Sequence, residues 1–487
     1  MRPRVQLLSA EVIGRILREA FELLMNPGVR VGSAPVVELL RAAGVEVTSG
    51  VARLPEALVR KCLASVPRDF YLYNRRGEKA VHYGGDDVHF DPGSCCVQML
   101  DPETLEARPS ETRDLVRIVQ VAESLPQFAA QSTAVVCSDS GAPGAIGDLY
   151  RLLVVLQHSD KPVVTGSFSA AGLPGMIDLL AADSGSREKL RQEPRAVFDV
   201  CPSPPLNWSE FGSHNLLDLA RAGVPAEIVA MPLAGGTAPV TLAGSVTQHA
   251  AEVLAGITLH QLAGAGSPVV WGGAPAIFDM HTGGAPMGAV ETAMLNMACA
   301  EVGKHLGLPT HGYLVATDSK FVDAQAGAES ARSAMLGALA GINMISGAGM
   351  IESLACHSVE KLVIDAESIA SAQRLARGIE IRGDEASGET LATGMFAQTG
   401  LSGEFLKLKE TRALFRQEQY LPSAVIDRSA HGSEAPTDIF TRARRRVGEL
   451  VNAYRKPALS EDVQRKFQEI VEREAERAGV VAELPGN

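Results

Sequence analysis

The sequence contains few aromatic residues and no excess of positive charge. Phe, Trp and Tyr together make up 5% of the 487 residues, and Trp occurs only twice. Lys and Arg number 45 against 57 Asp and Glu, which gives a formal net charge of −12. Nucleic-acid-binding proteins usually carry the opposite balance. We therefore set that class aside.

Long hydrophobic runs and paired-cysteine motifs are also missing. No segment approaches the ~20 consecutive apolar residues that a membrane-spanning helix needs. Charged residues interrupt the first 21 residues, so we expect no signal peptide there. The seven cysteines include no CxxC pair, which argues against a zinc ribbon or a thioredoxin-like motif. We expect reduced thiols, a cytoplasmic location and no membrane partner.

Several motifs of nucleotide, metal and hydrolase chemistry are absent as well. No GxGxxG string follows the first predicted barrel strand, and neither a Walker-type loop nor a GxSxG elbow occurs. The histidines at 281, 305, 311 and 357 show no HxxH or HxxxH pairing, so the sequence predicts no histidine metal site. The sequence therefore predicts no metal ligands.

The sequence up to residue 130 predicts an N-terminal extension of helices followed by a β-meander. Apolar residues recur at helical spacing over residues 10–26, 34–44 and 55–66. Short aromatic or β-branched runs separated by Gly, Asp or Pro cover residues 69–109, which is typical of a meander. A further helix is predicted from Ser110 to about Ser124.

Residues 131–385 predict an α/β fold, a closed (β/α)8 TIM barrel. Short apolar runs alternate with helical sequence, which is the pattern of parallel strands covered by helices. The predicted strands are 133–137, 162–166, 196–201, 227–232, 268–272, 310–316, 342–346 and 361–366. An open doubly wound sheet is the structural alternative. Residues 386–487 predict a C-terminal loop-rich segment and a helical tail. The charges of the last helix indicate either a face exposed to solvent or a contact within an oligomer.

The barrel prediction also locates the chemistry, because active sites of such barrels lie where strands end and the following loops begin. These positions hold Trp271 and Tyr313 as aromatic faces and Asp318 and Glu352 among the acids. The same residues have structural interpretations: the rings fill the core, and Asp318 caps the next helix. Glycine clusters near 235, 272 and 283 either form tight turns or present amides to a carboxylate.

Several blocks of the sequence resemble the trimethylamine methyltransferase (MttB-type) family. They are TAPVTLAGSVTQHAAEVLAGITLHQL, GAPMGAVETAMLNMACAEVGKHLGLPT, TDSKFVDAQAG, LGALAGINMISGAG, EKLVIDAE and GEFLKLKETRALFRQEQYLP. The resemblance extends over essentially the whole chain, and TDSKFVDAQAG is the most specific block. It implies a TIM-barrel methyltransferase that moves a methyl group from an amine to the Co(I) centre of a separate corrinoid protein.

The resemblance also indicates a branch of the family. Founding members carry pyrrolysine near the end of a late barrel strand, whereas this chain has standard residues there, around Gly349–Ile351. The chain is therefore similar to the non-pyrrolysine branch, whose characterised members act on quaternary amines such as glycine betaine. A quaternary nitrogen leaves as a neutral amine, so the protein's task reduces to positioning and electrostatics.

The resemblance together with the barrel positions suggests roles for individual residues. We expect aromatic faces to hold the trimethylammonium group by cation–π contact, and acids to supply its counter-charge. The expected substrate-binding residues are Trp271, Tyr313, Phe278, Gly235, Gly236, Thr237, Gly272 and Gly273, the amides of the last five holding a substrate carboxylate. The expected catalytic residues are Asp318, Glu352 and Glu404. Glu404 stands where the family pattern leads us to expect histidine. A carboxylate at this position implies stronger attraction of a cation, a different substrate or loss of activity.

No tightly bound cofactor is expected in this chain. Cobalamin carriers of known type show a D-x-H-x-x-G block, and no such string occurs here, so the corrinoid (cobalamin) is expected on a partner protein. We also expect a homo-oligomer. Two other functions stay open at this point: a non-catalytic methylamine-binding descendant of the family, and a barrel lyase or aldolase using Lys320 or Lys361 as a Schiff-base nucleophile.

Overall fold

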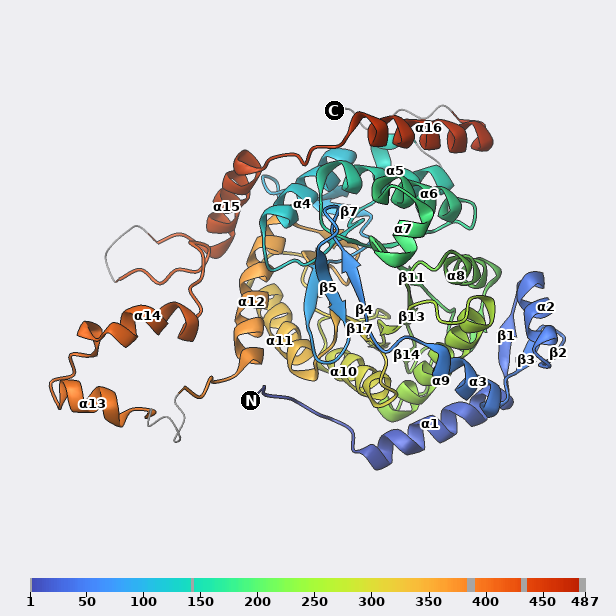
Figure 1. Ribbon diagram of the computed structural model, residues 1–487, viewed down its shortest axis with the longest axis horizontal. Helices are drawn as coiled ribbons and strands as arrows, with labels where there is room; N and C mark the ends of the chain where they lie inside the picture. Colours follow the sequence, from blue (N-terminus) through green and yellow to red (C-terminus); the bar gives the residue numbers. More distant parts are fainter. Residues whose placement is uncertain (1, 142–143, 383–389, 431–435, 481–487) are drawn as a thin grey trace.

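The computed structural model describes residues 2–141, 144–382, 390–430 and 436–480. Its centre is a barrel of parallel strands surrounded by helices (Figure 1), as the sequence predicts. The barrel strands are β6 (His89–Pro92), β9 (Gln131–Ser132), β10 (Val163–Gly166), β11 (Ala196–Val200), β13 (Ala226–Ala230), β15 (Val269–Gly273), β17 (His311–Tyr313) and β18 (Met344–Ala348).

Strand pairing closes this barrel. Strands β9, β10, β11, β13 and β15 form one parallel run, and β17, β18 and β6 form a second. A parallel bridge between Trp271 and Thr310 joins the two runs on one side. On the other side the Ala129 amide donates to the Phe90 carbonyl over 3.0 Å. Closure removes the free sheet edges.

Helices lie between the strands and cover the outside of the barrel. They are α4 (Thr112–Ser124), α5 (Gly144–His158), α6 (Gly172–Ser184), α7 (Arg187–Gln192), α8 (Glu210–Ala222), α9 (Leu242–Ala263), α10 (Val290–His305), α11 (Ala324–Ala340) and α12 (Val359–Arg377). Most of α9 and α10 is buried, because a helix that packs on the barrel and under further helices has little exposed surface. This burial explains why their sequences lack a clear polar face.

The predicted last barrel strand is wrong, and the predicted first barrel strand, 133–137, lies just after the observed β9 (Gln131–Ser132). Residues 361–366 do not form the last barrel strand but lie within helix α12, where Ser358 caps the first turn and Val359, Leu362 and Val363 are buried at helical spacing. The missing strand is β6, which lies inside the segment predicted as a meander. A buried polar pair, Lys361 and Asp365, interrupts the helical apolar pattern of α12 and makes it resemble a short strand.

The remainder of the predicted meander forms two separate hairpins. Strands β4 (Phe70–Tyr73) and β5 (Lys79–Tyr83) pair antiparallel, as do β7 (Gln98–Leu100) and β8 (Ala107–Pro109). Leu72, Val81 and Tyr83 of the first hairpin pack against residues of the barrel strands, namely Val164, Val197, Val270 and Met344. The β4–β5 hairpin thus fills the barrel from its amino-terminal end.

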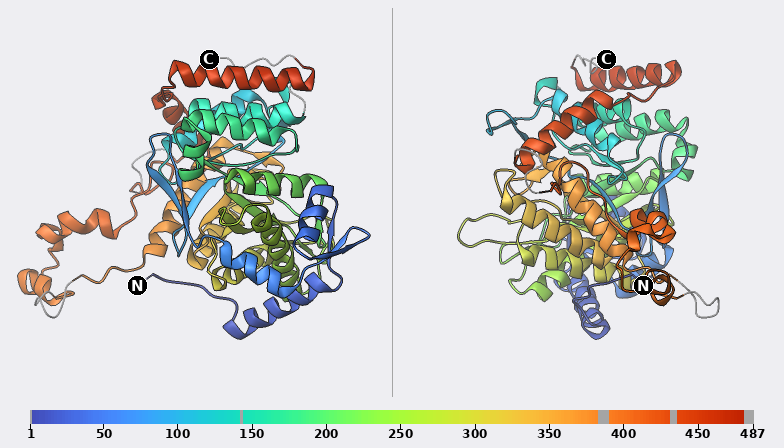
Figure 2. Two further views of the ribbon diagram at one scale, coloured as in Figure 1. Left: turned by 45° about the vertical axis from the view of Figure 1, so that its right-hand side comes forward. Right: turned by 90° about the vertical axis from the view of Figure 1, so that its left-hand side faces the viewer.

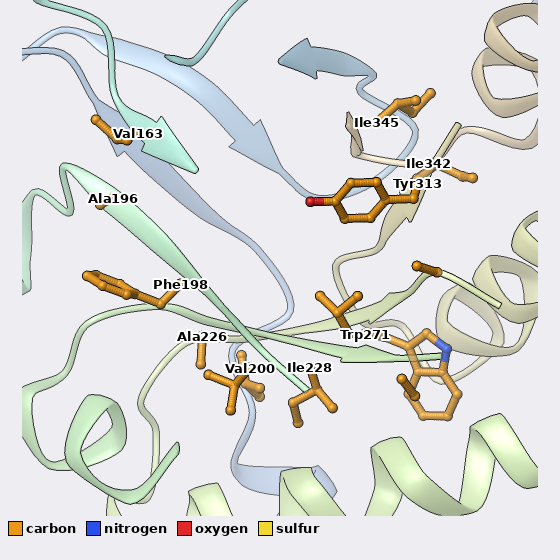
Figure 3. Packing of buried hydrophobic residues seen from close by; sticks show 14 of the residues in the cluster. Val163, Ala196, Phe198, Val200, Ala226, Ile228, Trp271, Tyr313, Ile342 and Ile345 are labelled. Carbon is orange, nitrogen blue, oxygen red and sulfur yellow. The ribbon is translucent and has the colours of Figure 1, made fainter. Parts of the chain in front are cut away.

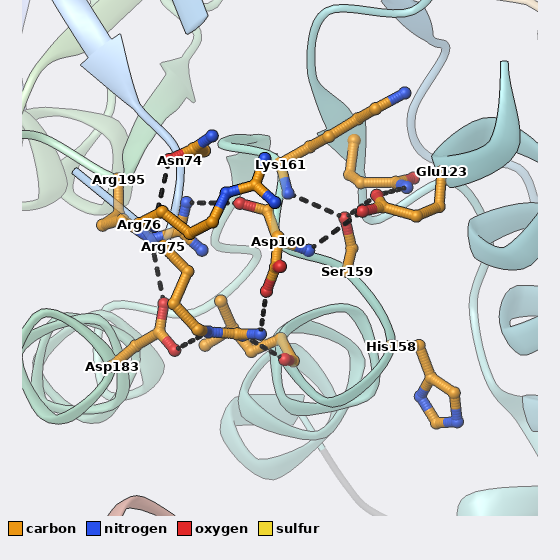
Figure 4. Close-up of polar contacts among 12 residues, drawn as sticks. Asn74, Arg75, Arg76, Glu123, His158, Ser159, Asp160, Lys161, Asp183 and Arg195 are labelled. Atoms are coloured by element: carbon orange, nitrogen blue, oxygen red, sulfur yellow. Dashed lines mark hydrogen bonds and ion pairs between the residues drawn. The ribbon is translucent and has the colours of Figure 1, made fainter. Parts of the chain in front are cut away.

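Buried ion pairs fix this hairpin to the helices around it (Figure 4). Arg75, in the β4–β5 turn, lies 2.7 Å from Asp160 and 2.7 Å from Asp183. Arg195, just before β11, lies 2.9 Å from the other oxygen of Asp183. Because the Asp183 side chain is fully buried, its charge depends on both guanidinium groups.

The N-terminal residues form a small unit beside α9. It contains α1 (Ala10–Met25), α2 (Ala34–Ala42) and α3 (Glu56–Ser65), with β1 (Val29–Val31), β2 (Glu46–Thr48) and β3 (Val51–Arg53). Strand β1 also pairs in parallel with β12 (Asn207–Trp208), from the loop after β11. The buried stripe of α1, which includes Ile13, Leu17 and Phe21, agrees with the predicted first helix.

Short strand pairs extend from the carboxyl-terminal end of the barrel. Strands β14 (Leu233–Ala234) and β16 (Ala276–Ile277) are parallel, whereas β19 (Met350–Ile351) and β20 (Cys356–His357) are antiparallel. A short 3-10 helix, η1 (Ser138–Ser140), follows β9.

The C-terminal segment projects from the body and then returns to it (Figures 1 and 2). Helices α13 (Thr393–Thr399) and α14 (Lys409–Glu418), with η2 (Phe405–Lys407) between them, contain no buried residue. Helices α15 (Ile439–Ala453) and α16 (Glu461–Ala478) pack back on the barrel helices. Within the described part of the chain, no helix combines the length and hydropathy needed to cross a bilayer.

Replacing Asp183 with Asn is expected to destabilise the fold strongly. The substitution leaves the buried Arg195 guanidinium without its carboxylate partner, while Arg75 keeps Asp160, and breaking such a buried pair costs about 3–5 kcal/mol. Chemical denaturation measures the loss. The control is Asp218→Asn, because Asp218 pairs with Arg221 on the surface of α8 and such pairs contribute about 0–1 kcal/mol. Equal losses in the two variants would contradict the anchoring role of Asp183.

Candidate functional site

A cavity of about 360 Å³ opens at the carboxyl-terminal ends of the barrel strands. Its wall contains three aromatic rings, those of Phe168, Phe211 and Tyr313, and one carboxyl group, that of Asp199. The other lining residues are Ser94, Cys95, Thr133, Gly166, Ser167, Val200, Cys201, Gly212, Asn215, Val229, Met231, Ala274 and Leu354. This position agrees with the general location of active sites in such barrels.

A layer of acidic and hydroxyl side chains lies between this cavity and the apolar floor. Asp199 on β11 and Glu227 on β13 are paired in register, so both side chains point into the barrel. The Tyr83 hydroxyl of the plugging hairpin donates to Glu227 Oε1 over 2.5 Å. The hydroxyl oxygen of Tyr313 lies 3.4 Å from Asp199 Oδ2 and donates to the Ser94 carbonyl over 2.7 Å.

A third carboxyl, Asp91 on β6, belongs to the same layer. The Ser346 hydroxyl donates to Asp91 Oδ1 over 2.5 Å, and the Ser346 hydroxyl oxygen lies 3.1 Å from Nε2 of His311. Burial lowers the pKa of His311 to about 3, so its ring is neutral at pH 7. Within the described residues, no Lys or Arg forms an ion pair with Asp91, Asp199 or Glu227.

The buried carboxyls consequently hold protons tightly. Burial raises the pKa of Asp199 to about 6. Burial raises the pKa of Glu227 well above its usual value, and the charge of the neighbouring Asp199 is the second largest cause. Burial likewise raises the pKa of Asp91. One oxygen of each carboxyl, Asp91 Oδ2, Asp199 Oδ1 and Glu227 Oε2, has no hydrogen-bond partner among the described residues. Of the three carboxyls, Asp199 alone lines the cavity.

Three of these residues also have the donor types of a metal site. One ligand atom each from Asp199, Glu227 and His311 lies within 4.8 Å of the others. Carboxylate and imidazole donors suit divalent ions such as Zn²⁺. These three residues therefore have the donor set of a metal-ion site. No spacing motif links these three residues, because they are far apart along the chain.

An ion pair on α5 fixes the loop that carries Phe168. Arg151 and Asp148 lie 2.8 Å apart, and the second carboxylate oxygen of Asp148 accepts the Phe168 amide over 2.7 Å. The Arg151 guanidinium lies 5.1 Å from the centre of the Phe168 ring and donates to the sulfur of Cys95 over 3.1 Å. This cavity wall is thus held by buried charges, although the Phe168 side chain itself is largely exposed.

Of the substrate-binding residues predicted from the sequence, only Tyr313 lines the cavity. Trp271, on β15, is 1% exposed, and its indole nitrogen donates to the Cys299 carbonyl of α10 over 2.9 Å. Its neighbours Val270 and Ala274 face the barrel interior and the cavity, so alternation along the strand directs Trp271 outward. In Figure 3 the Tyr313 hydroxyl points away from the Trp271 indole. Trp271 is therefore a core residue.

The glycine-rich segments predicted to bind a carboxylate have their amides occupied. The amides of Gly235, Gly236 and Thr237 donate to the carbonyls of Ala238 and Leu233 in a tight turn. Gly272 and Gly273 belong to β15 and pair with Val229 and Ala230 of β13. Phe278 follows β16 and does not line the cavity. The glycine-rich segments therefore have a structural role, because they form a tight turn and part of the sheet.

The predicted acids Asp318 and Glu352 lie beside the cavity but outside its wall. Asp318 accepts the Gly288 amide over 3.0 Å and the Ser353 hydroxyl over 2.7 Å, so it joins two loops. Glu352 lies 3.9 Å from Nζ of the exposed Lys320. Both acids have structural partners in the loops around the opening.

The third predicted acid, Glu404, is distant from the barrel opening in this structure. It precedes η2 on the projecting C-terminal segment (Figure 1), is exposed, and pairs with Lys407. Its environment within one chain is solvent, so a catalytic role for Glu404 has no support from this chain's own cavity.

Sequence reasoning missed Asp199, Glu227, Phe168 and Phe211. A signal for the first two was present: each is a lone acidic residue within an apolar run predicted as a buried strand. Charged residues are rarely fully buried unless they are paired. A single carboxyl in each of two neighbouring barrel strands therefore indicates a site inside the barrel.

Comparisons with known proteins point to one family. The family model described as "Trimethylamine methyltransferase (MTTB)" matches residues 1–479. The trimethylamine methyltransferase MttB of Desulfitobacterium hafniense is 29% identical over 481 residues, covering 98% of this chain and 95% of that protein. MttB2 of Methanosarcina mazei is 30% identical over 488 residues, covering 97% and 96%. A glycine betaine methyltransferase of D. hafniense is 27% identical over 482 residues, covering 98% of each chain.

The fold is also found among solved structures. The Methanosarcina barkeri monomethylamine methyltransferase (MtmB) superposes with a TM-score of 0.54, at 11% identity, and the match covers 98% of this chain and 89% of that chain. At this identity the match supports the fold alone, a TIM-barrel-like architecture.

The pH dependence of stability tests the carboxyl layer. The pKa of Asp199 is about 6 in the folded protein, above its usual value of 3.8. The folded state therefore binds more protons than the unfolded state in this window, and the contribution of Asp199 to stability is lost as pH rises from about 4 to 6. Asp199→Asn should be more stable than the wild type at pH 7–8, and the difference should vanish near pH 4. Thermal unfolding of both proteins across this range measures it; a variant that is less stable at every pH would contradict the assignment.

Proposed function

Because the chain belongs to the trimethylamine methyltransferase family and is a methyltransferase, we propose that it transfers a methyl group from a quaternary amine to the Co(I) centre of a separate corrinoid protein. The observation that carries this proposal is the cavity itself. It combines three aromatic rings with a carboxyl layer in which no Lys or Arg of the described residues forms an ion pair, and in which His311, 3.8 Å from Glu227, is neutral at pH 7.

This combination suits a fully alkylated nitrogen. A trimethylammonium group has no N–H to donate, so aromatic faces and carboxylates at modest range must recognise it. Cation–π contact contributes about 0.5–2 kcal/mol per ring, and Phe168, Phe211 and Tyr313 provide three rings. Asp199 supplies the negative charge from the cavity wall. Betaine-like substrates are proposed because the chain has standard residues around Gly349–Ile351, as in the non-pyrrolysine branch, and one relative is a glycine betaine methyltransferase.

The proposed transfer requires little acid–base help from the protein. The Co(I) nucleophile attacks the methyl carbon, the C–N bond breaks, and its electron pair stays on nitrogen, which leaves as a neutral tertiary amine. The substrate's positive charge disappears in the process, so strong neutralisation by Asp199 would hinder the step. A carboxyl pair that retains one proton carries a single negative charge. It binds the cation without stabilising the bound substrate so strongly that methyl transfer is slowed.

The methyl acceptor must reach the cavity from outside, and the rim of the opening suits a protein partner. Large apolar side chains are exposed on loops that follow the barrel strands: Val97, Phe168, Met231, Val240, Met280 and Phe321. Contiguous exposed apolar surface marks protein-binding sites, and we propose that these loops together form the docking surface. The seven cysteines are free thiols, which supports a cytoplasmic location as part of the proposal.

The Schiff-base alternative has no support from this site. Lys361 is buried and donates to the Val315 carbonyl and to Asp365, whereas Lys320 is exposed on a loop. Neither lysine lines the cavity. A non-catalytic methylamine-binding role makes the opposite prediction in the assay below, which is binding without transfer.

Methyl transfer to a Co(I) corrinoid protein tests the proposal directly. A panel of betaines is incubated with the enzyme, and the visible spectrum reports methyl–Co(III). Asp199→Asn should lower kcat/KM for the amine by about 10²-fold, because it removes a buried counter-charge. In the wild type, kcat/KM should rise as pH increases through about 6, where Asp199 ionises. Asp218→Asn on the surface of α8 is the control.

Three results would contradict parts of this proposal. Amine binding without methyl–Co(III) formation selects the non-catalytic role. Unchanged kinetics of Asp199→Asn remove the carboxyl layer from recognition. Stoichiometric divalent metal in the purified protein, lost on His311→Ala, would assign Asp199, Glu227 and His311 to a metal ion instead.

The rim is tested by charge insertion. Phe321→Asp and Met280→Asp should each raise KM for the corrinoid protein about tenfold, since burying an unpaired carboxylate in an interface is costly. The Kd for the amine should stay unchanged, because neither residue lines the cavity. Val12→Asp, at an exposed apolar position of α1, is the matched control. Equal KM values in all three variants would place the docking surface elsewhere.

A further inference from the structure

A strained turn lies over the cavity between β19 and β20. Glu352, Ser353 and Leu354 have φ values of 51°, 50° and 79°, so three consecutive non-glycine residues are left-handed. This conformation is unfavourable for residues with a Cβ atom, and such residues occur as single cases rather than in runs. Backbone strain of this kind persists only where the surroundings enforce it, and it is concentrated at functional sites.

Hydrogen bonds from several loops enforce the turn. The Glu352 amide donates to the Ser319 carbonyl over 2.9 Å, and the Ser353 amide donates to the Thr317 carbonyl over 3.0 Å. The Ser353 hydroxyl donates to Asp318, which in turn accepts the Gly288 amide. The turn is therefore connected to the loops after β16 and β17.

The same turn also holds the segment after β6. The Ala355 carbonyl accepts the amides of Val97 and Gln98, each over 3.2 Å. That segment contributes Ser94 and Cys95 to the cavity wall, and Leu354 contributes its side chain to the same wall. Three loops around the opening thus meet at one left-handed turn, and the residue with the largest positive φ of the three lines the cavity.

We infer that Leu354 is a specificity-determining residue that limits the size of the N-alkyl groups admitted to the cavity, and that Asp318 is a positioning residue which holds it there. A turn without backbone strain would keep its conformation without the hydrogen bond between Ser353 and Asp318. The inference rests on the proposed function for the chemical class of the ligand, but the geometry of the wall does not depend on methyl transfer.

The first experiment compares the binding of two simple cations, tetramethylammonium and tetraethylammonium, by calorimetry. Leu354→Ala should shift the ratio of their Kd values at least fivefold toward tetraethylammonium, because the shorter side chain enlarges the cavity. Ser353→Ala, which removes the bond to Asp318 but keeps Leu354, should shift the ratio in the same direction by less. Leu105→Ala is the matched control, because Leu105 is also left-handed, at φ 58°, but lies outside the cavity wall.

The second experiment measures the width of the cavity without a cation. Cys95 and Cys201 line the wall, so their alkylation by a bulky maleimide relative to methyl methanethiosulfonate, quantified by peptide mass spectrometry, reports access. Leu354→Ala should raise that ratio at least threefold, and Leu105→Ala should leave it unchanged.

The two experiments separate the inference from the proposed function. If the wild type binds neither cation while Leu354→Ala still widens access to the thiols, the cation pocket fails and the role of Leu354 as the limiting wall stands. If Leu354→Ala is folded by circular dichroism and changes neither the Kd ratio nor the labelling ratio, the inference is overturned, whatever the methyl-transfer assay shows.

Discussion

Three carboxyl groups buried in the barrel without a basic partner are the constraint on which the site depends. Removing Asp91, Asp199 and Glu227 from water disfavours their charged forms, and neither lysine nor arginine compensates them within the described residues. Asp199, with a pKa of about 6, is mostly ionised at pH 7, whereas the raised pKa values of Glu227 and Asp91 favour their protonated forms. The hairpin β4–β5 makes this arrangement stable, because its apolar residues close the barrel below and its Tyr83 hydroxyl satisfies Glu227.

The barrel interior therefore has three levels with different chemistry. The floor is aliphatic, the middle level carries the carboxyls, and the top is the cavity with its aromatic rings. Alternation along single strands produces this order: Val197, Asp199 and Cys201 on β11 and just after it contribute successively to the three levels. A ligand in the cavity is thus in contact with aromatic faces and close to negative charge.

The loops around the opening form a mechanically connected rim. Asp148 and Arg151 of α5 fix the Phe168 loop, and Asp318 connects the loops after β16 and β17 to the turn at 352–354. The relatives in the same family differ in the amines that their names state, trimethylamine and glycine betaine. A shared barrel with a rim built from loops is an arrangement in which substrate choice changes while the fold stays.

The sequence by itself determined the fold class, the N-terminal helices, most barrel strands and the family, because these depend on local periodicity and on contiguous blocks. It predicted Tyr313 at the end of a barrel strand, where the structure places this residue in the cavity wall; its role in substrate binding stays a prediction. It did not show which face of β15 carries Trp271, or that β6 rather than residues 361–366 completes the barrel. It also did not show that Asp199, Glu227 and Asp91 lie close together. Those outcomes depend on strand parity and on contacts between residues far apart in the chain, which only the closed barrel brings together.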